Sequence, residues 1–325
     1  MGMGNSAGFS WYTKTSDACA NFFLKPASAK PLAAFRIGLS LVLLWQSFLL
    51  HDIFFKLFGP LGFVQREVSD LMYQQAFPRF NWIIDLLTPW GISEHNALAL
   101  FGVLYIVGLC SLLLGLFSHA SAALVWFLHW SFTNTGFSGV YGVDMYTQVF
   151  LFYLMWAPSG AAFSLDILLG RMTHEPSWQA RLAIRVLQLH MCISYLASGI
   201  EKASGEQWWN GDVLWIALNT PGYSRIDFHW LAHVPMLAML ACWATLVIEI
   251  FYCVMVWPKK SRMLWVIATC SLHLGIALFL NLTIFGILMC VPTIALFAFD
   301  GEPHRDSPQA LGKLSGLSFM GKSPC

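Results

Sequence analysis

The apolar segment 182–201 carries polar side chains in a helical pattern that could do acid–base chemistry. Spaced at 100° per residue, they fall on two adjacent stripes of one helix. One stripe holds Gln188, Tyr195 and Lys202, the next holds His190, Ser194 and Glu201, and Ser198 lies between them. A helix that faces lipid does not carry such a face, so this face is expected to line a cavity or a polar interface.

Lys202 and Glu201 end this polar face and are the first candidates for chemistry. A lysine can accept a proton when a dry, apolar site holds it neutral. The simpler alternative is that Lys202 reaches out to the lipid headgroups, but this does not explain the polar stripe beneath it.

Three further charged residues, Arg36, Arg185 and Glu249, lie within apolar runs, where a charge is costly. Helical rise places each of them about 21–25 Å from the outer end of its segment. This shared level predicts a structural ion pair between Glu249 and either Arg36 or Arg185. A proton relay is the alternative.

His190 and His273 lie near the middle of their segments. For His190, a hydrogen bond to a neighbouring helix and a role in a site fit the pattern equally well. His273 is the only ionisable group of its apolar stretch, which favours a site. Two histidines without further ligands at a recognisable spacing do not predict a metal. Asp144 follows the glycine-rich stretch 134–142 and is either an ordinary helix cap or a second polar group of the site.

The composition explains why these polar groups stand out. Of the 325 residues, 57% are hydrophobic and 11% are charged, whereas a soluble domain carries roughly 25% charged residues. This composition excludes a soluble enzyme. The net charge of +1 lacks the excess of basic residues that is typical of nucleic-acid-binding proteins. The eight cysteines form no CxxC pair, so no zinc or thioredoxin-type centre is indicated. The predicted fold class is an all-α integral membrane protein in a lipid bilayer.

About eight apolar segments approach the length of about 20 residues that a transmembrane helix needs. They lie at 32–50, 97–117, 118–134, 145–157, 182–201, 235–257, 263–281 and 284–299. The long loops 51–95 and 202–234 are rich in tryptophan, which predicts interfacial helices on the outer side. The chain thus divides into a polar tail over 1–30, one membrane domain over 31–300 and a polar tail over 301–325.

The basic residues predict the orientation. With eight spans, eleven of the 18 Lys and Arg residues lie on the side of the N-terminus, five lie opposite and two lie within helices. The positive-inside rule then places both tails in the cytoplasm. Met1–Ser6 also matches the short pattern for myristoylation of Gly2, which arises often by chance.

Four motifs occur in an order that resembles a known membrane family. The most specific is Tyr195-Leu196-Ala197-Ser198-Gly199-Ile200-Glu201-Lys202 followed by Trp209 and Gly211, and the others are Phe35-Arg36-Ile37-Gly38, Thr245 with Glu249, and His273 with Gly275. Together they resemble the membrane region of vitamin K-dependent gamma-glutamyl carboxylases and their bacterial relatives, the horizontally transferred transmembrane (HTTM) domain. The resemblance covers residues 30–300.

This resemblance implies that Lys202 is a base that helps to deprotonate vitamin K hydroquinone at an extracytoplasmic-facing site. The catalytic residues are then expected to be Lys202, Glu201, Asp144 and His273. A reduced quinone is expected to lie against Tyr195, Ser198, His190, Trp208 and Trp209, with no metal. The bacterial inner membrane is the expected location.

Three departures from the carboxylases bear on the reaction. The carboxylases have a second lysine where this chain has Glu201, and a histidine where Asp144 aligns. The chain also shows no counterpart of their large globular substrate domain, so carboxylation of glutamate itself is not expected. In size it resembles the sporulation-delaying protein B group, whose members mature an exported peptide together with a partner protein.

Two classes of function therefore remain open. The first, which we favour, is an enzyme that uses a quinol to oxidise or modify an exported peptide. The alternative is a non-catalytic maturation or assembly factor whose cavity holds a peptide or a partner protein.

The predicted topology can be tested by labelling Cys325 with a membrane-impermeant thiol reagent. Because the positive-inside rule places both tails in the cytoplasm, Cys325 should react only after the cells are permeabilised. Labelling in intact cells would show that the C-terminus is outside.

Overall fold

The computed structural model describes residues 6–299, apart from 60, 65–67, 69, 72–76, 137–138 and 225, with side chains from residue 15 onward. The predicted tail 301–325, with Cys325, and the candidate acylation site Gly2 lie outside the described residues. Within the described part every regular element is a helix, which confirms the all-α prediction.

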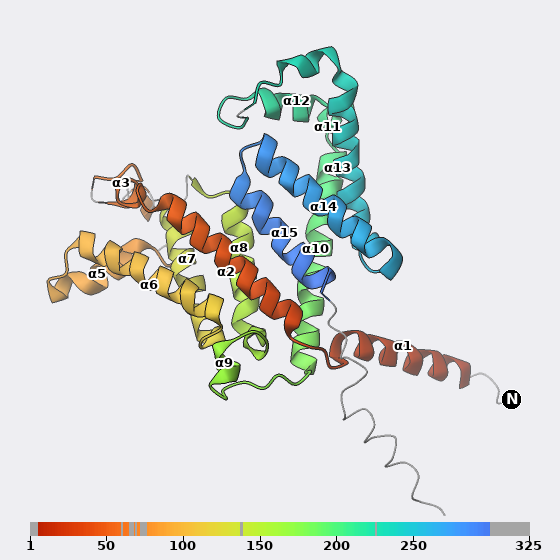
Figure 1. Cartoon of the computed structure of the whole chain (residues 1–325), viewed down its shortest axis with the longest axis horizontal. Coiled ribbons are helices and arrows are strands. Elements are labelled where there is room, and N and C mark those ends of the chain that lie inside the picture. The colour runs from red at the N-terminus through yellow and green to blue at the C-terminus, as the bar shows by residue number, and fades with distance from the viewer. Residues whose placement is uncertain are drawn as a thin grey trace, which may run out of the picture.

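Eight long helices form the body of the molecule (Figure 1). They are α2 (Lys30–Leu50), α6 (Glu94–Leu114), α7 (Ser118–Thr135), α8 (Gly142–Trp156), α10 (Trp178–Ala203), α13 (Pro235–Met255), α14 (Lys259–Phe279) and α15 (Thr283–Phe297). Five of them, α2, α6, α10, α13 and α14, are long and apolar enough to cross a bilayer. The other three predicted spans coincide with α7, α8 and α15, which are shorter or more polar, so eight crossings stay a prediction.

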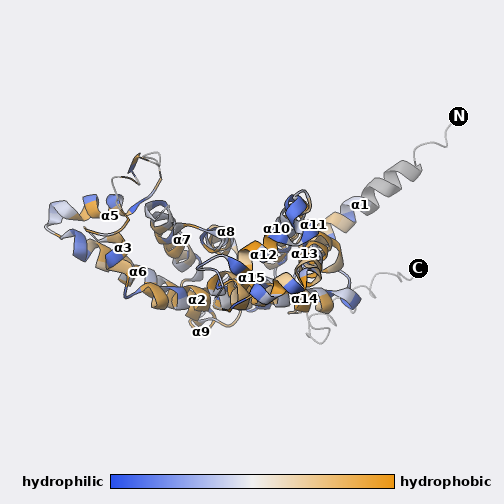
Figure 2. Ribbon diagram, turned by 90° about the horizontal axis from the view of Figure 1, so that it is seen from above, coloured by the Kyte–Doolittle hydropathy of each residue, from blue (hydrophilic) through white to orange (hydrophobic). Residues whose placement is uncertain are grey.

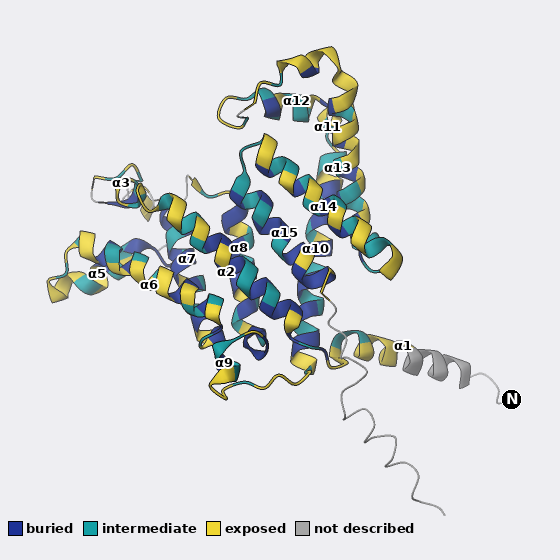
Figure 3. Cartoon of the chain, in the orientation of Figure 1, coloured by how far each residue is buried: buried dark blue, intermediate teal, exposed yellow. Residues whose placement is uncertain are grey.

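The outward faces of the long helices suit a lipid environment. Val103 on α6, Val247 on α13 and Leu264 on α14 are all exposed. Hydrophobic residues also dominate these helices when the molecule is seen from above (Figure 2). The chain is therefore an integral membrane protein whose buried residues gather where α2, α8, α10 and α15 meet (Figure 3).

The two loops predicted to hold interfacial helices do contain short helices. The first holds α3 (Phe54–Phe58) and α5 (Phe80–Leu87), followed by the 3-10 turn Thr88–Trp90. The second holds α11 (Glu206–Asn210), α12 (Asp212–Asn219) and the 3-10 turn His229–His233. In Figure 1, α11 and α12 lie beyond the end of α10, beside the first half of α13.

Most of the predicted N-terminal polar tail is helical, since residues Ser6–Leu24 form helix α1. In Figure 1 this helix extends away from the bundle. Its C-terminal end is joined to α10, where Arg181 Nε donates to the Lys25 carbonyl at 2.8 Å and Arg185 Nε donates to the Phe22 carbonyl at 3.3 Å. The Arg185 guanidinium also lies 4.4 Å from the centre of the Phe22 ring, which adds a cation–π contact.

Arg36 is fully buried and ties α2 to two other segments. Its Nη1 donates to the carbonyls of Leu112 and Leu113 at 2.5 and 3.0 Å, and its Nη2 donates to the Phe163 carbonyl at 2.7 Å. The last carbonyls of a helix lack partners within the helix and carry its negative dipole end. Arg36 therefore satisfies the C-terminus of α6 and is a structural cation.

Asp166 holds the start of α7 in a similar way. The residue lies in the short helix α9 (Leu165–Leu168) and accepts hydrogen bonds from the Phe117 and Ser118 amides at 2.8 and 2.9 Å. Burial alone would raise the pKa of Asp166. The two amide hydrogen bonds lower it by more, together with a hydrogen bond from the Ser118 hydroxyl and the charge of the nearby Arg171. The pKa of Asp166 therefore lies below its ordinary value, and the carboxylate stays charged as a cap.

The helices α14 and α15 approach closely at Gly286. A Cβ atom at this position would clash with the His273 carbonyl oxygen and would lie 2.8 Å from Ala277 Cβ. Gly286→Ala should therefore lower the unfolding temperature, because backbone atoms must move to admit the methyl group. Thermal unfolding in detergent measures this effect.

The matched control is Gly102→Ala in α6. A Cβ atom there would meet nothing within 4 Å, and alanine favours a helix over glycine by about 0.5–1 kcal/mol. Gly102→Ala should leave the unfolding temperature unchanged or raise it. Equal destabilisation by the two variants would contradict the close approach at Gly286.

Candidate functional site

The polar stripe of α10 meets three different helices. Gln188 Nε2 donates to the Leu296 carbonyl at the end of α15, at 2.7 Å. Two helical turns further along α10, the Tyr195 hydroxyl lies 2.7 Å from His273 Nε2 of α14. Lys202 then pairs with a carboxylate of α13. The prediction that this face lines a cavity or a polar interface is therefore confirmed for Gln188, Tyr195 and Lys202, each of which is bonded to another helix.

Lys202 is held by an ion pair with Glu249. Its Nζ lies 2.8 and 2.7 Å from the two carboxylate oxygens and donates to Ser198 Oγ at 2.5 Å. The Glu249 side chain is 6% exposed, whereas that of Lys202 is 25% exposed. The Trp208 ring centre lies 5.5 Å from Nζ, which adds a cation–π contact. The ion pair is thus buried on the carboxylate side and open on the amine side.

This pairing corrects the prediction that Glu249 binds Arg36 or Arg185. Arg36 binds backbone carbonyls of other segments, and Arg185 Nη1 donates to Gln188 Oε1 at 2.9 Å. The prediction that these three residues lie at one depth assumed that the C-terminus of α10 and the N-terminus of α13 are level on the outer side. Instead, Gly199 of α10 packs directly against Ile250 of α13.

The offset between the two helices follows from this contact and a second one. A Cβ atom at Gly211, beyond the end of α10, would lie 2.7 Å from the Met239 amide nitrogen. The first half of α13 therefore lies beside α11 and α12, and Glu249 faces the last turn of α10. The estimate of depth failed because it counted residues from the start of α13, which extends beyond α10.

An open depression lies beside the ion pair. Its walls come from the last turn of α10 and from α11: Ser198, Glu201, Lys202, Gly205, Glu206, Gln207 and Trp208. Lys202 is the only basic group in this lining, and two carboxylates face the same space. The arrangement could bind a polar or cationic group, or present the lysine to a substrate that arrives from outside the helices.

Several predicted site residues lie near this ion pair or on the same helix. Tyr195 and His273 form a buried pair deeper in the bundle, and the Tyr252 ring lies 4.4 Å from the Tyr195 ring. His190 is on another side of α10, with its Nδ1 3.2 Å from the Tyr153 hydroxyl of α8. His190 is therefore a hydrogen-bonded helix contact.

Two predicted site residues lie elsewhere. Asp144 is buried at the start of α8, where it accepts a hydrogen bond from the Tyr141 amide at 3.2 Å, and it lines a different cavity from Lys202. Its geometry is that of a helix cap. Trp209 is about half exposed, and its indole donates to the Ala203 carbonyl at 2.8 Å. Trp208 rather than Trp209 faces Lys202.

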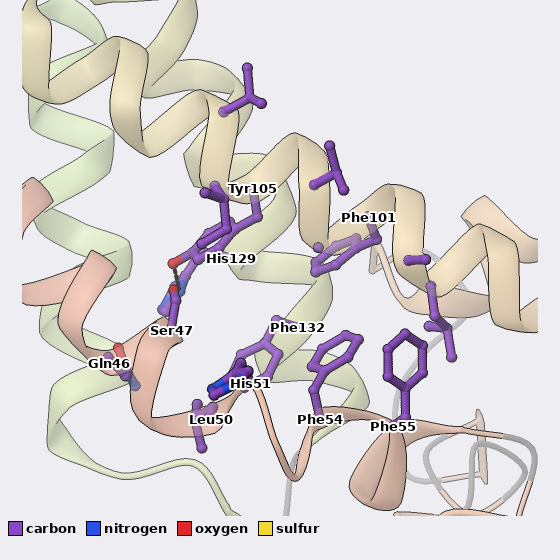
Figure 4. Close-up of a pocket in the computed structure, with 16 residues that line it drawn as sticks. Gln46, Ser47, Leu50, His51, Phe54, Phe55, Phe101, Tyr105, His129 and Phe132 are labelled. Atoms are coloured by element: carbon purple, nitrogen blue, oxygen red, sulfur yellow. Dashed lines mark hydrogen bonds between the residues drawn. The ribbon is translucent and has the colours of Figure 1, made fainter.

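The sequence reasoning missed a second polar pair, Tyr105 of α6 and His129 of α7. The Tyr105 hydroxyl lies 3.1 Å from His129 Nδ1, and the His129 side chain is buried. Both line a cavity of about 490 Å³ between α2, α6 and α7 (Figure 4). An ionisable residue within the apolar run 118–134 was the available signal.

Within the part of the chain that the structure describes, no three His, Cys, Asp or Glu side chains gather closely enough to hold a metal ion. Comparisons of this chain with family models, with curated proteins and with solved structures find no match. The resemblance to the HTTM family therefore rests on the motifs named above.

Because Glu249 is more deeply buried than Lys202, removing either side chain should change the free energy of unfolding by a different amount. Lys202→Met leaves the buried Glu249 carboxylate without its partner, which costs about 3–5 kcal/mol for a fully buried pair. Glu249→Met should cost less, because the lysine is a quarter exposed and can turn toward water. Denaturant unfolding in detergent measures both changes.

The double variant Lys202→Met/Glu249→Met is the control for this cycle. It removes both charges, so it should recover most of the stability that Lys202→Met loses. Strictly additive losses in the double variant would show that the two side chains do not interact.

Proposed function

We propose that the protein is a membrane enzyme in which Lys202 and Glu249 transfer a proton to and from a lipid-soluble quinol. The reaction would oxidise the quinol or modify an exported peptide, as the resemblance to the vitamin K-dependent carboxylases implies. The observation that carries the proposal is that both carboxylate oxygens of Glu249 contact Lys202 Nζ while the amine side opens into a depression.

The geometry offers a way to produce a neutral lysine. Where water is excluded, the ammonium–carboxylate ion pair loses much of its stability relative to a neutral amine and a carboxylic acid. A proton can then pass from Lys202 Nζ to the Glu249 carboxylate oxygen 2.7 Å away. The freed amine could then take a proton from a quinol hydroxyl in the depression. Glu249 would act as the proton store, which agrees with the proton relay that the sequence offered as the alternative to a structural ion pair.

The other predicted residues would have different tasks. Glu201, beside Lys202 in the lining, could bind the polar end of a substrate, and Trp208 offers an aromatic wall. Tyr195 and His273 would position α10 against α14. Asp144 would act as a cap at a distance from this chemistry.

A second candidate is a non-catalytic maturation factor for an exported peptide. The observation that favours it is that Lys202 Nζ already has Glu249 and Ser198 as partners, as in an ordinary structural ion pair. The depression would then hold a peptide or a partner protein. Under both proposals the site faces the outside of a bacterial inner membrane, with both termini in the cytoplasm.

The enzyme proposal can be tested with the full chain in nanodiscs, supplied with vitamin K hydroquinone and oxygen. Wild-type protein should form the epoxide and water, measured by liquid chromatography and mass spectrometry. Lys202→Ala and Lys202→Arg should both lose at least tenfold in rate, because an arginine stays protonated at any accessible pH.

Two controls separate loss of chemistry from loss of fold. The double variant Lys202→Met/Glu249→Met should fold but form no epoxide, and Lys259→Ala, which changes an exposed lysine of α14, should keep full activity. An active Lys202→Arg variant would rule out the base role. Absence of epoxide with wild-type protein would leave the maturation factor ahead.

A further inference from the structure

The cavity between α2, α6 and α7 is separate from the Lys202 depression and shares no residue with it. Its volume of about 490 Å³ lies within the range of small-molecule sites, roughly 300–1,000 Å³. Aromatic and aliphatic side chains make most of the wall, as Figure 4 shows for Phe54, Phe55, Phe101 and Phe132.

The cavity opens toward lipid along α6. Val103, Ile106 and Val107 belong to its lining and are also exposed on the outside of the helix. Since α6 is long and apolar enough to cross a bilayer, this rim faces hydrocarbon. Leu98 and Phe101 form the buried wall. A molecule dissolved in the bilayer can therefore enter sideways, without passing through water.

The cavity has five polar lining residues, and Tyr105 and His129 form a hydrogen-bonded pair among them (Figure 4). The others are Gln46, Ser47 and His51, and the Ser47 hydroxyl already donates to the Leu43 carbonyl. His129 Nε2 lies 3.4 Å from the Asp144 carbonyl oxygen, which can only accept a hydrogen bond. A neutral His129 therefore carries its proton on Nε2, and Nδ1 is the acceptor. The Tyr105 hydroxyl, 3.1 Å away, must then donate to Nδ1.

This assignment determines which hydrogen-bonding group a ligand must have to bind Tyr105. The proton of Tyr105 is committed to His129, so the tyrosine oxygen can only accept a hydrogen bond from a ligand. At Tyr105, a ligand hydroxyl satisfies this requirement, whereas a carbonyl or an ether oxygen does not.

We infer that the cavity binds a lipid-soluble amphiphile with one hydrocarbon chain and a hydroxyl head. The chain lies along α6 between Phe101 and Phe132, and the hydroxyl donates to Tyr105. From Leu98 to Val107 the helix offers about 14 Å of length along the chain. The site is distinct from the Lys202 depression and does not rest on the function proposed for it.

The test uses the full chain in nanodiscs and a photoreactive diazirine derivative of hexadecanol. Irradiation should label peptides of α6 and α7, identified by mass spectrometry. The methyl ether of the same probe has no proton to donate, so it should label them roughly two- to tenfold less. Equal labelling by the alcohol and the ether would overturn the inference, as would labelling confined to other helices.

Two variants separate the polar end from the apolar wall. Tyr105→Phe alone is insufficient, because His129 Nδ1 would then be free to accept from the ligand. Tyr105→Phe/His129→Leu should abolish the preference for the alcohol while the ether still binds, which also shows that the cavity is intact. A preference that persists in this variant would contradict the role of Tyr105.

Gly102→Leu blocks the cavity from α6. Gly102 belongs to the lining, and a Cβ atom there meets nothing within 4 Å, so the larger side chain can enter the space without displacing the backbone. Labelling by both probes should fall at least tenfold, with the unfolding temperature retained. Undiminished labelling of α6 and α7 in this variant would place the probes on the lipid-facing surface outside the cavity.

Discussion

Polar groups buried among apolar helices must find partners within the protein, because lipid offers none. Helix α10 meets this constraint with three side chains at seven-residue intervals, Gln188, Tyr195 and Lys202, each bonded to a different helix. Their partners lie on α15, α14 and α13. One face of α10 thus contacts all three C-terminal helices, and the candidate site is the contact nearest the C-terminal end of α10.

The position of that site depends on how α10 and α13 are offset. Gly199 admits Ile250 at a distance that no side chain would allow, and this contact brings Glu249 to Lys202. The proposed chemistry and the stability of the bundle therefore depend on the same ion pair. The buried carboxylate requires a cation, while the partly exposed amine remains accessible from the depression.

The periodicity of Gln188, Tyr195 and Lys202 was sufficient to predict a polar interface, because helical geometry alone determines which residues share a face. The partner of Glu249 was not predictable in this way, since it depends on the offset between helices far apart in the chain. The all-α membrane class followed from composition. The pairing of Tyr105 with His129 did not, because it arises only when α6 and α7 pack together.

Arg36 has a consequence for biosynthesis. Its carbonyl partner Phe163 lies 127 residues further along the chain, and Leu112 lies 76 residues further. When α2 first enters the membrane, neither partner has been made. Arg36 is six residues from the start of α2, about 9 Å along the axis, so in the proposed orientation it can reach the cytoplasmic headgroups in the meantime. The final burial of Arg36 must therefore wait until α6 and the segment before α9 have been synthesised, so α2 reaches its final packing only after most of the helices that follow it have been made.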